Sequence, residues 1–332
     1  MTLELLSRLI GIPSHSREEG PAASFLEEWL CAQGLQPRRC GNNLWCVKGQ
    51  GPVVLLDAHI DTVKPADGWT QDPYTAWRDG DRLYGLGAND DGGSLAALVQ
   101  AFLRYSPRRI TLVLSLSAEE EVSGKNGFEK ALEAIQAEVG PVSCGIIGEP
   151  TGMQAAVSEK GLMVLDCLST GVSGHAARGE GVNALYQALP DLLWFRDQGM
   201  QVTQIQAGEQ HNVIPDSCRF VVDVRTCGPN EATLERIRQV VRCHVTPRST
   251  RLSGRAIDPS HPLVKAAQAV GLETMASSTL SNQAFCPFPT IKLGPGDSAR
   301  SHTVNEYIGL DEVQRAVDVY LKLLESYEQN MG

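Results

Sequence analysis

The stretch Val53-Val54-Leu55-Leu56-Asp57-Ala58-His59-Ile60-Asp61 decides the fold. It opens with a continuous apolar run, which is typical of a strand buried on both faces in a parallel sheet covered by helices, and we predict a strand over Val53–Asp57. Similar runs predict strands at Ile110–Ser117 and Cys144–Gly148. Open parallel sheets bind ligands beyond the carboxyl ends of their strands. The polar residues that follow these strands are therefore expected at one edge of the sheet.

Acids and histidines follow these strands and the loops between them. His59 and Asp61 come after the first strand, Glu119–Glu121 after the second and Glu149 after the third. Two further candidates, Asp90 and His302, lie in loops, the first inside the glycine-rich stretch 85–93. Oxygen and nitrogen ligands brought together at one edge would describe a two-metal hydrolase.

Each of these motifs also has a purely structural interpretation when taken alone. A His or Asp at a strand end is commonly a turn residue, and Asp90 before a helix could be an N-cap. Three successive acids are usually a solvated charge run. The metal-site interpretation explains more, because a bound dication removes the repulsion between the neighbouring carboxylates of Asp90 and Asp91. Adjacent residues leaving a strand also point in different directions, so one Glu can bind metal while its neighbour faces a water.

Composition narrows the class of protein. The 332 residues carry a formal net charge of −10, which argues against a nucleic-acid partner. The nine cysteines form no C-x-x-C pair and indicate reduced thiols in a cytoplasmic protein. The first residues lack the order of a secretory signal, and no apolar run is long enough to span a membrane.

The order of predicted elements indicates an α/β fold with an insertion. Helices are expected along residues 3–10, with Leu3, Leu6 and Ile10 on one face, and at 20–34 and 94–104. Residues 158–259 then follow a β-α-β-β-α-β order that is typical of an α+β sandwich. Its predicted elements are strands at 161–170, 201–207, 218–224 and near Thr250, and helices at 182–196 and 231–243. A helix at 262–271, a strand at 290–293 and a helix at 310–325 complete the first domain, which spans residues 1–157 and 260–332.

Several short motifs together resemble one family, the two-zinc amidohydrolases that include acetylornithine deacetylase, succinyl-diaminopimelate desuccinylase, aminoacylases and related carboxypeptidases. The resemblance covers essentially the whole chain. The motifs occur in the order HID (59–61), GLGANDDGG (85–93), AEEE (118–121), GEPT (148–151), GVSGHAARGEGVNA (171–184), NVIP (212–215), DVR (223–225) and GPGDSARSH (294–302).

The resemblance implies a site built from both domains of a zinc-peptidase-like fold. It implies two Zn²⁺ per chain, for which Co²⁺ can substitute, and a homodimer formed through the inserted lid domain. His59 and Glu149 would bind the first ion, Glu121 and His302 the second, and Asp90 both. Glu120 would be the general base and Asp61 the residue that orients His59, with a cis peptide bond after Asp90. The inserted domain would supply His175, which stabilises the oxyanion from the partner subunit, together with Asn212 and the carboxylate-binding Arg225.

The sequence departs from the family pattern at Leu86, where many relatives carry Arg, and at Asp91, where many carry Met. An acidic triplet also replaces the commoner Asp-Glu-Glu, so the base and ligand could be Glu119 and Glu120 or Glu120 and Glu121; we assign the second pair.

The stretch around Gly294 and Gly296 resembles the acetylornithine deacetylase type. It favours an N-acetylornithine, N-acylcitrulline or N-succinylornithine substrate in arginine biosynthesis. A succinyl-diaminopimelate substrate, a dipeptide or carboxypeptidase substrate, and a metal-binding homologue without catalysis are the alternatives. A succinyl group would need a second cation, for which Lys160, Arg178 and Arg300 are candidates.

Overall fold

A computed structural model describes residues 2–330, which divide into two compact units. The first unit holds the chain up to Ser158, Ile257–Ser277 and the residues from Ser281 onward. The second holds Glu159–Ala256 and, in addition, Ser278–Leu280, a short segment that the sequence did not indicate.

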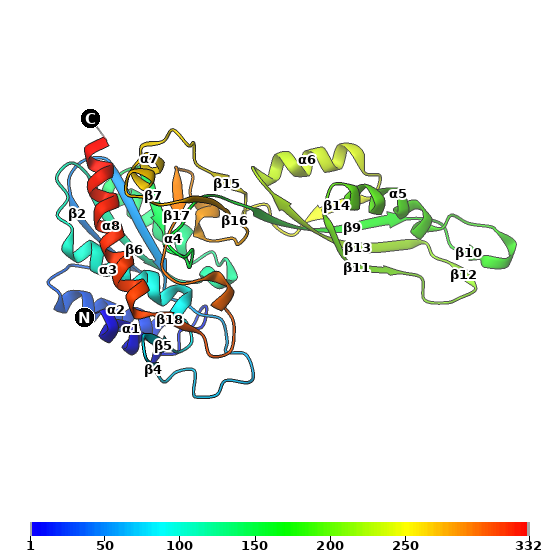
Figure 1. The fold of residues 1–332 in the computed structure, drawn as a ribbon. Coiled ribbons are helices and arrows are strands. Elements are labelled where there is room, and N and C mark those ends of the chain that lie inside the picture. Colours follow the sequence, from blue (N-terminus) through cyan, green and yellow to red (C-terminus); the bar gives the residue numbers. More distant parts are fainter. Residues whose placement is uncertain (1, 331–332) are drawn as a thin grey trace. The chain divides into compact units, whose positions relative to one another are not determined.

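The first unit is built on a mixed sheet whose centre is parallel (Figure 1). Its strand order is β1-β2-β6-β3-β7-β17-β8-β15, with β16 paired to β8. The pairs β6–β3, β3–β7 and β7–β17 are parallel, while β1–β2, β2–β6 and β17–β8 are antiparallel. The strands are β1 (Arg38–Cys40), β2 (Asn43–Gly49), β3 (Val53–His59), β6 (Thr111–Ser117), β7 (Val142–Ile147), β8 (Ala155–Glu159), β15 (Arg255–Ala256), β16 (Thr274–Ser277) and β17 (Thr290–Lys292).

Helices cover both faces of this sheet, as the apolar run in β3 predicted. Every residue of β3 is buried: Val54 and Leu56 pack into the larger core with α3 and α8, and Val53 and Leu55 into a smaller core with α4. The predicted α/β class with a mostly parallel central sheet is therefore confirmed. The helices are α1 (Thr2–Ile10), α2 (Gly20–Ala32), α3 (Gly93–Arg104), α4 (Phe128–Val139), α7 (Pro262–Ala269) and α8 (Leu310–Asn330).

A small antiparallel sheet, β18-β5-β4, belongs to the same unit. Its strands are β4 (Trp77–Asp79), β5 (Arg82–Tyr84) and β18 (Tyr307–Gly309). The rings of Trp77 and Tyr84 stack with centroids 3.8 Å apart, and Arg300 lies over the ring of Tyr307. These contacts fix the end of the loop that carries His302.

The second unit is a four-stranded antiparallel sheet, β11-β13-β9-β14, with two helices packed on one face (Figure 1). Its order along the chain is the predicted β-α-β-β-α-β. Alternate residues of β9 and β13 are buried against the helices, which is the pattern of a sheet with one covered face. The elements are β9 (Gly161–Thr170), α5 (Ala184–Asp197), β11 (Gln201–Ala207), β13 (Ser217–Thr226), α6 (Asn230–Val240) and β14 (His244–Pro247), with a separate two-stranded antiparallel sheet of β10 (Gly174–His175) and β12 (Val213–Ile214).

Two sequence predictions were wrong in detail. The last strand of the second unit is not near Thr250 but at His244–Pro247, where Val245 is buried opposite Cys167; Pro247, which lacks an N–H, ends it. In α1 the buried residues are Leu5, Leu6 and Ile10, whereas Leu3 is 37% exposed.

Two expectations from composition can be compared with the fold. All nine cysteines are free thiols. Among the described residues, we find no helix with the length and apolarity needed to cross a bilayer.

Candidate metal centre

His59 ends strand β3 and points a ring nitrogen at Asp90. Its Nδ1 lies 2.9 Å from the main-chain oxygen of Asp61, and its Nε2 lies 3.1 Å from Oδ1 of Asp90. Because a carbonyl can only accept, Nδ1 carries the hydrogen and Nε2 keeps its lone pair for a metal ion. The Asp61 carboxylate is farther from Nδ1, at 3.6 Å. Asp61 therefore holds His59 mainly through its backbone.

The Asp61 carboxylate organises the turn that carries the acidic triplet. It is 1% exposed and accepts hydrogen bonds from the backbone nitrogens of Glu120 and Glu121, at 3.0 and 3.1 Å, and from the Ser16 hydroxyl at 2.7 Å. Glu119, the first residue of the triplet, has a left-handed backbone with φ of 56°. Glu120 and Glu121 thus leave β6 in a turn that is set by a neighbouring loop.

Three side chains offer a ligand atom to one place. Atoms of His59, Asp90 and Glu121 all lie within 4.8 Å of one another. Nε2 of His302 lies 3.0 Å from the Glu121 carboxylate and 3.7 Å from Oδ2 of Asp90. The Glu119 carboxylate instead accepts from the backbone nitrogen of Asn126, at 3.4 Å. This arrangement favours Glu120 and Glu121 over Glu119 and Glu120 as the base and ligand pair.

The electrostatics of the cluster suit a bound dication. Burial raises the pKa of Glu120 well above its usual range, and the nearby carboxylates of Glu121, Asp61 and Asp90 raise it further. Burial also raises the pKa of Glu149, and Glu120 and Asp90 add to the effect. The hydrogen bond that the His302 imidazole donates to the Glu121 carboxylate raises the pKa of His302 to about 9. A positive ion would relieve this repulsion, and the oxygen and imidazole donors fit zinc.

The two departures from the family pattern are both buried. Leu86 is 6% exposed and Asp91 is 1% exposed. Burial raises the pKa of Asp91 well above its usual range, and the charges of Glu149 and Asp90 add to this. The peptide bond between Asp90 and Asp91 is cis, as the resemblance implied.

Gly294 and Gly296 act as close-packed backbone. A Cβ at Gly294 would lie 2.4 Å from the carbonyl oxygen of Glu149, and one at Gly296 would lie 2.3 Å from Oδ1 of Asn89. Gly296 also has φ of 86°, which favours glycine. These two positions bring the 294–302 loop against the residues that flank Glu149 and Asp90.

The remaining predicted residues belong to the second unit. His175 caps a short helical turn, its Nδ1 accepting from the backbone nitrogen of Ala177, and it pairs with Val213 in the two-stranded β10–β12 sheet, beside Asn212. Arg225 is exposed and forms a two-point ion pair with Asp223, at 2.9 and 3.2 Å. The candidate cations Lys160 and Arg178 are in this unit too, whereas Arg300, in the first unit, is paired with Glu312 at 2.8 Å.

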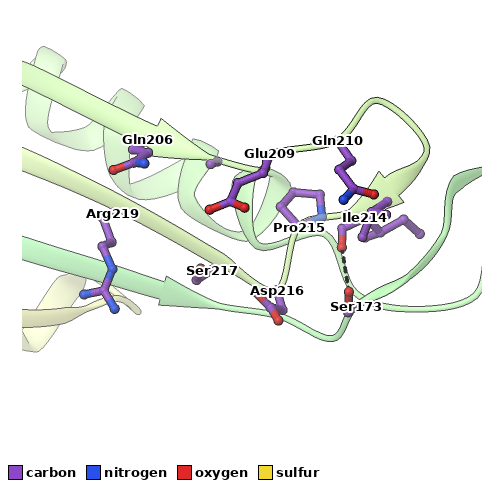
Figure 2. Close-up of a pocket in the computed structure, with 12 residues that line it drawn as sticks. Ser173, Gln206, Glu209, Gln210, Ile214, Pro215, Asp216, Ser217 and Arg219 are labelled. Atoms are coloured by element: carbon purple, nitrogen blue, oxygen red, sulfur yellow. Dashed lines mark hydrogen bonds between the residues drawn. The ribbon is translucent and has the colours of Figure 1, made fainter.

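A cavity of about 340 Å³ lies next to this two-stranded sheet (Figure 2). Its lining includes Gln210 and Val213 on either side of Asn212, and the carboxylates of Glu209 and Asp216. Two of the lining residues are linked by a hydrogen bond, which the Ser173 hydroxyl donates to the main-chain oxygen of Ile214 at 3.4 Å (Figure 2). The second unit therefore has a polar cavity of its own beside two predicted site residues.

Sequence reasoning missed the buried polar residues that hold the metal-binding loops. Glu19 is fully buried and accepts from the backbone nitrogens of Arg17 and Glu119, and Asn89 and Glu306 bind the backbone of loops far away in the chain. Their only sequence signal is an acid or amide close to a candidate ligand, which is too common to use.

Comparison with known proteins agrees with this geometry. Residues 55–326 match the model of peptidase family M20/M25/M40. A succinyl-diaminopimelate desuccinylase of Rhizorhabdus wittichii is 26% identical over 374 residues, which cover 99% of each chain.

Solved structures share the whole fold. A tripeptidase from Staphylococcus aureus superposes with a TM-score of 0.77 at 20% identity, over 99% of this chain and 98% of that one. A dinuclear metal binding peptidase of the M20 family from Bacillus subtilis gives 0.74 at 17% identity, over 97% and 96% of the two chains.

Fold and site together define a metal-dependent hydrolase with an inserted domain. The chain belongs to peptidase family M20/M25/M40.

Proposed function

We propose that this protein hydrolyses the N-acyl amide bond of an amino acid, releasing a carboxylic acid and a free amine. The observation that carries the proposal is the convergence of His59, Asp90 and Glu121, with His302 3.0 Å from Glu121 and Glu120 on the same turn. A metal-binding homologue without catalysis would have no need for a half-buried acid such as Glu120 beside a complete set of ligands.

The donor set supports two zinc ions. His59, Asp90 and Glu149 would hold one, and Asp90, Glu121 and His302 the other, with Asp90 shared. When bound, such ions polarise a carbonyl group and lower the pKa of water.

Glu120 is proposed as the general base. Its carboxylate is surrounded by other acids and its pKa is raised by burial, so it can both take a proton from water and give it up again. The proton would then pass to the amine that leaves. Asp61 would fix Glu120 for both transfers through the hydrogen bond to its backbone nitrogen.

The second unit is proposed to complete the site. His175 would stabilise the negative oxygen that develops on the acyl group, Asn212 would act beside it, and Arg225 would bind the α-carboxylate of the substrate. Arg225 would then exchange its ion pair with Asp223 for the substrate. Gly294 and Gly296 are proposed to line the substrate position with their backbone.

A homodimer through the second unit is also proposed. Helix α5 exposes Tyr186, Leu189 and Leu193, which are 67%, 45% and 49% exposed and share one face at helical spacing. Strand β11 is an edge of the four-stranded sheet and exposes Ile205. An apolar stripe beside an open sheet edge supports self-association, which would let His175 act on the partner's substrate.

N-Acetylornithine is the first candidate substrate, because the 294–302 loop resembles that of acetylornithine deacetylases, and a role in arginine biosynthesis follows from it. An N-succinyl amino acid, such as succinyl-diaminopimelate, is the second, supported by the 26% identical relative. A succinyl carboxylate would need a further cation. Because Arg300 is paired with Glu312, Lys160 and Arg178 are the better candidates.

The experiment is a substrate panel with the purified, zinc-loaded chain. N-Acetylornithine, N-acetylcitrulline, N-succinylornithine, succinyl-diaminopimelate and a set of dipeptides are compared by the appearance of free amine. Hydrolysis of N-acyl amino acids supports the proposal, and the ratio of kcat/KM between acetyl and succinyl substrates decides between the two candidates. A chain that holds two zinc ions and cleaves none of them would be a non-catalytic homologue.

A further inference from the structure

Glu306 holds the backbone around Asp90. Its carboxylate is 2% exposed and accepts hydrogen bonds from the backbone nitrogens of Asn89 and Asp90, at 2.8 and 2.9 Å. Its own main-chain oxygen accepts from the backbone nitrogen of Gly85, at 3.0 Å. A residue from the end of the His302 loop thus fixes the turn from which the Asp90 side chain projects.

Asn89 holds the His302 loop in return. It is fully buried, and its side-chain nitrogen donates to the main-chain oxygen of Asp297 and to the hydroxyl of Ser301, at 3.0 and 3.1 Å. Its side-chain oxygen accepts from the backbone nitrogen of Asp297, at 3.1 Å. Ser301, whose hydroxyl also hydrogen-bonds to the Asp90 carboxylate, directly precedes His302.

The His302 loop needs these contacts to keep its shape. His302 and Asn305 have φ of 60° and 56°, a left-handed backbone that most residues other than glycine avoid and that Asn tolerates best among them. Such conformations persist where surrounding contacts determine them. Asn89 binds the loop before His302, and Glu306 lies at its end, so the two residues hold both sides of the strained segment.

We propose that Asn89 and Glu306 are positioning residues that set the distance between Asp90 and His302, and thereby the affinity for the second metal ion. The inference rests on the metal centre of the proposed function. Both side chains are committed to backbone groups and buried away from the ligand atoms, so they act through Asp90 and His302. The clamp they form is reciprocal, since each loop supplies the residue that holds the other.

Two variants test the clamp. Asn89→Ala removes the three contacts to the 297–301 segment, and Glu306→Ala removes the single oxygen, Oε1, that accepts from the backbone nitrogens of both Asn89 and Asp90. Outer partners of metal ligands typically contribute about 10–100-fold to metal affinity. We therefore expect the second zinc ion to bind about 10–100-fold more weakly in either variant. The first ion should change much less, because the hydrogen bonds of Asn89 and Glu306 end on residues 297–301 and on the Asp90 turn, and of the first ion's ligands only Asp90 is directly held by them.

Glu328→Ala is the matched control. The Glu328 carboxylate is 6% exposed and accepts from the backbone nitrogens of Arg108 and Arg109, at 2.9 and 3.0 Å. It is the same kind of buried acid, but it holds the segment that leads into β6, at the opposite end of that strand from the acidic triplet. This variant should lower the unfolding temperature without changing the dissociation constant of either zinc ion.

The measurement is a calorimetric titration of metal-free protein with Zn²⁺, repeated with Co²⁺, alongside the unfolding temperature of each metal-free variant. Selective weakening of the second ion, with activity restored by excess metal, supports the clamp. The proposal would be overturned if Asn89→Ala bound two ions with the dissociation constants of the wild type. It would also be overturned if the affinity for both ions fell equally. If the wild-type chain itself takes up fewer than two ions, the proposed function fails first and the inference with it. Should Glu306→Ala not fold, Asn89→Ala alone decides, since it leaves the hydrogen bonds from Glu306 to the Asp90 turn intact.

Discussion

Replacing Asp61 with Asn separates its two roles. The carboxylate accepts from the backbone nitrogens of both Glu120 and Glu121, whereas the backbone oxygen holds Nδ1 of His59. Asn keeps the backbone oxygen and one side-chain oxygen, but its NH₂ group must face one of the two N–H donors. Asp61→Asn should therefore disturb the acidic turn and leave His59 in place.

The expected fall in kcat follows from the energy of the hydrogen bond that is lost. A hydrogen bond to a charged acceptor contributes about 1.5–3 kcal/mol. At about 1.4 kcal/mol for each tenfold change, this corresponds to a fall in kcat of about 10–150-fold. The second metal ion should also bind more weakly because Glu121 is one of its ligands, while the first ion should be almost unaffected.

The assay combines kcat on the best substrate of the panel, at saturating metal, with a zinc titration. Ser16→Ala is the control. It removes one hydrogen bond to Asp61 but leaves the two hydrogen bonds from the backbone nitrogens of Glu120 and Glu121, so it should lower kcat less than Asp61→Asn does. An Asp61→Asn enzyme with wild-type kcat would show that the carboxylate does not set the turn. Loss of the first ion would show that it holds His59 after all.

Two further predictions concern protons and assembly. Because Glu121 raises the pKa of His302 to about 9, this histidine is protonated in metal-free protein at pH 7.5 and must lose its proton when zinc binds; apparent zinc affinity should rise with pH up to about 9. Calorimetry in two buffers with different ionisation enthalpies measures the protons released, and no release at pH 7.5 would contradict the ligand role of His302. Separately, Leu189→Glu with Leu193→Glu should convert a dimer to a monomer in light scattering and, if His175 acts on the partner's substrate, reduce kcat by about a hundredfold or more. An active monomer would refute the role of His175 in trans, and Glu substitution of the exposed Val240 serves as a control for added charge.

The central strands and the polar residues at their ends were predictable because both leave strong sequence patterns. A run such as Val53–Leu56 can be buried on both faces only in a covered sheet, and His59 follows it directly. The small sheet β18-β5-β4 and the edge strand β1 were not predicted. Each of these strands is three residues long, too short to show an alternation of apolar and polar residues.

The loop clamp shows why part of the site could not be predicted. Asn89 and Glu306 are separated by 217 positions, and they act on backbone nitrogens and oxygens that every residue possesses. No side-chain pattern marks the partner of a main-chain contact. The same holds for the second contact of Asp61, whose carboxylate lies 3.6 Å from His59 and also binds the backbone of the acidic turn.

The most direct test of the proposed function is the hydrolysis rate of Glu120→Gln with both metal sites filled. Gln has the shape of Glu but cannot take up a proton, so the variant should bind two zinc ions like the wild type and lose about 10²–10⁴-fold in kcat on the best N-acyl amino acid. A fully metal-loaded Glu120→Gln chain with wild-type turnover would contradict the assignment of Glu120 as the base, and with it the proposed mechanism.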